Sequence, residues 1–179
     1  MRVAIAQRSP VLLNRQQSLE VVESAIVEAA DAGAGLVAFG ETFVPGYPIW
    51  LEHTDAARFD SALLKELHAR YVLNAVDIGA GHLDGLCRLT RDRRIAVVRG
   101  VAERDPRRGQ SLFATAVSID AEGEIRAQHR KLVPTYEERL AWSHGDAHGL
   151  TTWPLQEFTV GVLNCWENWM PLARAALYG

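Results

Sequence analysis

The sequence is poor in cysteine and in long apolar runs. Two cysteines, Cys87 and Cys165, occur among 179 residues, so at most one disulfide could form. The longest apolar runs, residues 36–39 and 159–163, are far too short to span a membrane. The opening residues 1–7 are too short for a signal peptide and are typical of a first strand. Together these absences favour a cytoplasmic protein with free thiols.

An excess of positive charge is also missing. The formal net charge is −3, and the contents of 48% hydrophobic and 23% charged residues are ordinary for a globular domain. A nucleic-acid-binding surface would require a basic excess, so we expect no nucleic-acid partner. Paired cysteines and the HExxH spacing of metal sites are absent, which leaves His144, Asp146 and His148 as a weak metal candidate. We therefore expect no metal.

The apolar pattern predicts a single α/β domain, residues 1–179, with a mixed sheet covered by helices. Strands are expected at residues 2–7, 35–39, 95–101, 111–119, from 124 onward and at 158–163. Helices are expected at 17–32, after a cap at Asn14, at 56–73, at 82–93 and from Pro171 onward, with a polar loop at 130–151. Cys87 lies in a helical pattern and is expected to pack as a small apolar residue.

Three chemically useful residues follow three of these strands. Cys165 lies between an apolar strand and a helix that begins at Pro171, and a helix N-terminus favours the nucleophilic thiolate. Glu41 follows the strand 35–39, where partial burial would raise its pKa and suit a general base. Lys131 follows a strand and could stabilise a developing negative charge. Taken singly, each has a plainer interpretation: a buried structural cysteine, a solvated or capping glutamate, and a solvated basic cluster.

The segments around these residues resemble three motifs of the nitrilase superfamily, in the family's order. Residues 39–48 (FGETFVPGYP) resemble its glutamate motif, 129–139 (HRKLVPTYEER) its lysine motif and 164–172 (NCWENWMPL) its cysteine motif. Within the superfamily, the sequences PTYEER and CWEN are more similar to the nitrilase branch than to the amidase branches.

The resemblance implies an α-β-β-α sandwich with mixed β-sheets and a Cys165–Glu41–Lys131 triad. Glu138 matches a second family glutamate that supports the lysine or substrate, with Glu137 as the lower-ranked alternative. Tyr47 and Trp166 are candidate pocket walls or, equally, packing residues. The implied chemistry requires no cofactor, and the family suggests a homo-oligomer, dimer or higher. Members continue beyond the point that corresponds to Gly179, so we expect C-terminal strands of the domain to be missing.

Three functional hypotheses follow. The first is a nitrilase that converts an organic nitrile to the carboxylic acid and ammonia through a thioimidate and a thioester on Cys165. The second keeps the triad but acts on an amide, a carbamoyl group or cyanide. The third is a truncated, catalytically silent subunit that assembles with longer partners.

Overall fold

The computed structural model describes residues 1–179 and contains one mixed sheet, one hairpin and five α-helices. The strands are β1 (Val3–Ile5), β2 (Leu36–Ala38), β3 (Ala96–Arg104), β4 (Leu112–Ile119), β5 (Ile125–Arg130), β6 (Thr152–Leu155) and β7 (Phe158–Gly161). The helices are α1 (Arg15–Asp31), α2 (Trp50–His53), α3 (Ala62–Asn74), α4 (Asp84–Arg93) and α5 (Pro171–Tyr178). None of them combines the length and the hydropathy that a membrane crossing requires.

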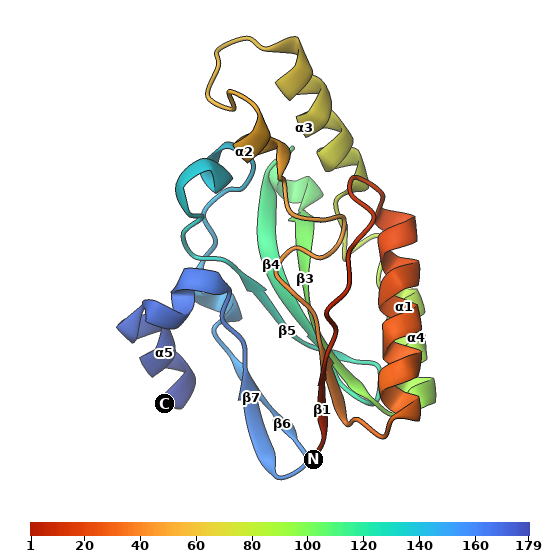
Figure 1. Ribbon diagram of the computed structural model, residues 1–179. Helices are drawn as coiled ribbons and strands as arrows, with labels where there is room; N and C mark the ends of the chain where they lie inside the picture. The colour runs from red at the N-terminus through yellow and green to blue at the C-terminus, as the bar shows by residue number, and fades with distance from the viewer.

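The sheet has the strand order β1-β2-β3-β4-β5. Strands β1, β2 and β3 are parallel, whereas β3, β4 and β5 pair antiparallel. Helices α1 and α4 lie against one face (Figure 1), where they pack on alternate residues of β3 such as Val97 and Val101. Because successive side chains of a strand point to opposite faces, the intervening residues of β3 face away from these helices.

The hairpin β6–β7 lies on the other face of the sheet. Trp153 and Leu155 of β6 pack against residues of β2, β3 and β5, namely Leu36, Ala96 and Ala127. The hairpin tip lies near the N-terminus (Figure 1), and the terminal amino group forms an ion pair with Glu157 at 3.3 Å. The predicted α/β class with a mixed sheet is therefore confirmed.

Local signals set most of the helix boundaries. Asn14 caps α1, as predicted, by accepting a hydrogen bond of 3.0 Å from the backbone N–H of Gln17. The helix expected at 56–73 begins only at Ala62, because the cap is Ser61, whose hydroxyl accepts from Leu64 N. Pro171 opens α5 as expected. Cys87 of α4 borders the core beneath the sheet, as expected for a small apolar residue.

Two strands in the second half of the chain differ from the prediction. Strand β6 was not predicted, because it contains Pro154, a residue that argues against a strand, and its two-residue turn, Gln156-Glu157, lacks the usual turn residues. The strand expected at 158–163 ends at Gly161 and is mostly exposed, because it pairs only with β6. The polar loop 130–151 also contains two short 3₁₀ turns, η2 (Tyr136–Leu140) and η3 (Ala147–Gly149).

Candidate active site

Lys131 is the centre of a buried charged cluster. It directly follows β5, and its backbone N–H donates to Ala114 O on β4 at 2.7 Å. Its side chain is 1% exposed, and its Nζ lies 2.9 Å from Glu41 Oε1 and 2.7 Å from Glu138 Oε2. The structure thus brings together Glu41, Lys131 and Glu138, which are distant in sequence.

Glu41 reaches this cluster because the loop after β2 crosses closely over β3. At the crossing point, a Cβ on Gly100 would lie 2.6 Å from Glu41 Cα and would collide with the backbone of Thr42. Only a glycine therefore permits this approach. Burial raises the pKa of the Glu41 carboxyl, and the neighbouring Lys131 ammonium offsets part of that rise. The direction agrees with the expected general base.

Glu138 is held by neighbours on several elements. Its Oε2 accepts from Thr135 N at 2.6 Å, and its Oε1 accepts from the Tyr47 hydroxyl at 3.1 Å. The bond from Thr135 N is half of a capping box at the start of η2. Glu137, the alternative named from the sequence, is exposed. The structure therefore places Glu138, and not Glu137, beside Lys131.

The two carboxylates keep Lys131 charged in a buried environment. Burial by itself would lower the pKa of Lys131, but the hydrogen bond to Glu138 and the ion pair with Glu41 outweigh it and raise the pKa. The Trp142 ring lies 5.8 Å from Nζ and forms a cation–π contact with it. The cluster therefore presents a fixed positive charge next to a carboxylate of raised basicity.

Cys165 opens the 3₁₀ turn η4 (Cys165–Trp169), which lies between the hairpin and α5. The residue is exposed, and its φ of +48° is in the left-handed region that non-glycine residues rarely occupy. Such a conformation requires support from its surroundings, and it clusters at functional sites. The exposed thiol rules out the plainer interpretation of a buried structural cysteine.

Glu167 attaches the Cys165 turn to the end of β5. Its carboxylate is fully buried and contacts His129 Nε2 at 2.9 Å. It also accepts from the backbone N–H groups of Leu132 and Asn164, each at 2.7 Å. The sequence suggested a structural Glu167 but not its partner His129. The available signal was the spacing of Asn164 and Glu167, which forms a second capping box.

The two candidate pocket residues differ in their surroundings. The Tyr47 ring packs edge-on against Trp142 with centroids 5.5 Å apart, and its hydroxyl bonds Glu138, so it borders the cluster. Trp166 is 57% exposed and contacts Trp169 at a centroid distance of 6.1 Å. Tyr47 therefore forms part of the cluster's wall, whereas Trp166 lies on the exposed turn that carries Cys165.

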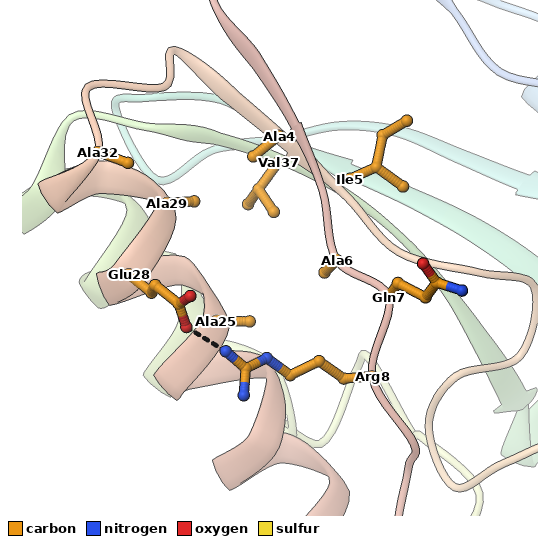
Figure 2. A pocket seen from close by; sticks show the side chains of 10 residues that line it. All are labelled: Ala4, Ile5, Ala6, Gln7, Arg8, Ala25, Glu28, Ala29, Ala32 and Val37. Atoms are coloured by element: carbon orange, nitrogen blue, oxygen red, sulfur yellow. Dashed lines mark hydrogen bonds and ion pairs between the residues drawn. The ribbon is translucent and has the colours of Figure 1, made fainter.

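A groove of about 390 Å³ lies elsewhere, between β1 and α1 (Figure 2). Figure 2 shows small side chains such as Ala25 and Ala29 along it and the Arg8–Glu28 ion pair across one end. It contains none of the residues singled out from the sequence. His144, Asp146 and His148 are not brought together as a group that could hold a metal ion.

Comparisons with known proteins identify the family of the chain. Residues 2–179 match the family of carbon–nitrogen hydrolases. A protein named nitrilase 2, from an unknown prokaryotic organism, is 39% identical over 98% of this chain and 54% of its own length. An aliphatic nitrilase of Rhodococcus rhodochrous is 36% identical over 99% of this chain and 46% of its own length. The chain spans about half the length of these curated relatives.

Solved structures share the same fold. A mutant of the amidase from Nesterenkonia sp. AN1, with acrylamide added at its active-site cysteine, has a TM-score of 0.68 and 23% identity. The match covers 98% of this chain and 61% of the amidase. A carbon–nitrogen hydrolase from Helicobacter pylori G27 has a TM-score of 0.67 and 16% identity, over 98% of this chain and 55% of that one.

Proposed function

The chain belongs to the carbon–nitrogen hydrolase family, and from this premise we propose that it hydrolyses an organic nitrile to the carboxylic acid and ammonia. The observation that carries the proposal is the Lys131 ammonium buried between Glu41 and Glu138. A strained, exposed Cys165 lies on a turn attached to the same strand end. Together these supply a nucleophile, a base and a cation, all from side chains.

In the proposed reaction, the Cys165 sulfur attacks the nitrile carbon. The S–C bond forms, an electron pair of the C≡N bond moves to nitrogen, and Glu41 transfers the thiol proton to that nitrogen. The product is a thioimidate. Water then adds to its carbon, ammonia leaves, and a thioester remains. A second water, deprotonated by Glu41, breaks the C–S bond, releases the acid and returns the proton to the sulfur.

Lys131 and Glu138 have supporting roles in this scheme. Negative charge develops during the thiol and water additions, and the fixed Lys131 ammonium stabilises it together with the backbone N–H of Trp166. Glu138 orients Lys131, because its carboxylate is itself fixed by Thr135 N and the Tyr47 hydroxyl. Tyr47, which borders the charged cluster, and Trp166, which follows Cys165, are proposed to border the bound nitrile.

Amide hydrolysis is the second candidate. An amide and a nitrile reach the same thioester, so the charged cluster supports both. The nitrilase relatives, at 36–39% identity, favour the nitrile. A homo-oligomeric state, a cytoplasmic location and the lack of a nucleic-acid partner stay predictions.

The test is release of ammonia and acid by the purified chain from a panel of nitriles and their matching amides. Cys165→Ala is the negative control, and Cys87→Ala is the matched control for loss of a thiol. We expect release from nitriles that exceeds release from the amides, is lost in Cys165→Ala and is retained in Cys87→Ala. Faster turnover of the amides would favour the amidase hypothesis, and no release from any substrate would contradict the proposal for this chain.

A further inference from the structure

One buried carboxylate contacts both sides of the proposed catalytic pair. Glu167 accepts from Asn164 N, which directly precedes Cys165, and from Leu132 N, which directly follows Lys131. Both distances are 2.7 Å. A single side chain therefore connects the nucleophile-bearing turn to the cation-bearing strand end.

Glu167 is fixed by a third partner, His129, at 2.9 Å. The Nδ1 atom of His129 is buried and has no hydrogen-bond partner, so a proton there would be an unsatisfied buried donor. The arrangement therefore fits an imidazole whose Nε2–H donates a hydrogen bond to Glu167. The carboxylate then accepts from three donors. His129 and Leu132 lie at the end of β5, and Asn164 lies next to Cys165.

The charge of Glu167 is consistent with this role. Burial by itself would raise the pKa of Glu167, but the hydrogen bonds from His129, Leu132 and Asn164 outweigh it and lower the pKa. The carboxylate thus stays ionised at neutral pH. An ionised acceptor forms shorter and stronger hydrogen bonds than a neutral one, which suits a fixed connection between two segments.

We propose that Glu167, held by His129, is a positioning residue that sets the place of Cys165 relative to Lys131 and maintains the left-handed conformation of Cys165. The inference rests on the proposed function, in which Cys165 and Lys131 act on one substrate carbon. Glu167 itself does not touch the substrate in this scheme. Its loss would move the nucleophile without removing any reacting group, and a misplacement of about 1 Å can cost roughly 100-fold in rate.

The test compares Glu167→Gln with Glu103→Gln. Glu103 is an equally buried carboxylate on the opposite face of the sheet, where it accepts from Thr115, Gln128 and Arg130. We expect Glu167→Gln to lower kcat by about 100-fold with little change in KM. Glu103→Gln should leave the kcat of the folded protein unchanged, although both variants lose a buried carboxylate that accepts three or more hydrogen bonds. A Glu167→Gln variant with the kcat of Glu103→Gln would overturn the proposal.

A second readout does not depend on nitrile turnover. The rate of Cys165 alkylation by iodoacetamide is followed by peptide mass spectrometry, with Cys87 as the internal reference in the same sample. We expect the ratio of the Cys165 rate to the Cys87 rate to change several-fold in Glu167→Gln but not in Glu103→Gln. An unchanged ratio in Glu167→Gln would overturn the positioning role. A changed ratio in Glu167→Gln, together with no nitrile turnover by the wild-type chain, would overturn only the proposed function.

His129 provides a variant pair in case Glu167→Gln does not fold. His129→Gln retains a donor at a reach similar to that of Nε2, whereas His129→Phe removes it at a similar volume. We expect His129→Phe to reduce kcat and change the alkylation ratio, and His129→Gln to restore much of both. Equal values for the two variants would contradict a hydrogen bond from His129 as the source of the positioning.

Discussion

Replacing Lys131 with methionine would leave two buried carboxylates without their cation. The side chains of Glu41 and Glu138 are 19% and 6% exposed, so water replaces little of what is lost. Glu138 would keep Thr135 N and the Tyr47 hydroxyl, but Glu41 Oε1 has no other partner. Removing one partner of a buried ion pair costs about 3–5 kcal/mol, chiefly because the remaining charge is uncompensated. We expect Lys131→Met to lower the free energy of unfolding by that amount at pH 7.

The loss should depend on pH in a defined direction. The pKa of Glu41 is already raised and rises further without Lys131, so this carboxylate takes up a proton first as the pH falls. A neutral carboxyl no longer requires the cation, and the difference between wild type and variant should therefore shrink at acid pH. The assay is urea unfolding of both proteins at several pH values, read by circular dichroism.

A second substitution checks the cause of the loss. In the double variant Lys131→Met/Glu41→Gln the uncompensated charge on Glu41 is gone, so part of the stability should return. A decrease in the free energy of unfolding of less than about 1 kcal/mol in Lys131→Met at pH 7 would contradict a buried ion pair, because an exposed pair contributes that little. A loss that is independent of pH and unaffected by Glu41→Gln would refute it as well.

Three further predictions concern the same sheet. The value of kcat/KM should fall as the pH decreases through the raised pKa of Glu41. The acid limb of the pH profile should therefore lie above the ordinary glutamate range. An acid limb at or below that range would contradict Glu41 as the base. Gly100→Ala should abolish turnover, because its Cβ would displace the Glu41 loop, and an active variant would show that the loop can shift freely. Arg99 is fully buried, and all three of its guanidinium nitrogens lack a hydrogen-bond partner. Arg99→Met should therefore raise the free energy of unfolding by about 1–3 kcal/mol. A lower free energy of unfolding, measured by urea unfolding, would contradict this.

The sequence pattern placed Glu41 and Lys131 after strands, but the resemblance to the nitrilase superfamily was needed to single them out. Glu41 and Lys131 both follow strands of one sheet, and the strands themselves were recognisable from apolar runs bounded by glycine and polar residues. The choice of Glu138 over Glu137 rested on resemblance alone. Periodicity could not decide it, because adjacent residues in a polar loop carry no signal about which one faces the cluster.

Other features depend on tertiary contacts that no local pattern reveals. Strand β6 is specified by the packing of Trp153 and Leu155 across the sheet, and its proline argues locally against a strand. The attachment of Glu167 to His129 joins residues 38 positions apart. The buried Arg99 conflicts with the apolar pattern of its strand, so sequence reasoning would place an exposed residue there.

The most direct test of Cys165 as the nucleophile is to detect the covalent intermediate. The chain is mixed with a nitrile that it hydrolyses, quenched in acid during turnover, digested and examined by mass spectrometry. We expect an acyl or imidate adduct on the peptide that contains Cys165, none on the Cys87 peptide, and neither adduct nor turnover in Cys165→Ala. Turnover that continues in Cys165→Ala at the wild-type rate would contradict the assignment of Cys165 as the nucleophile.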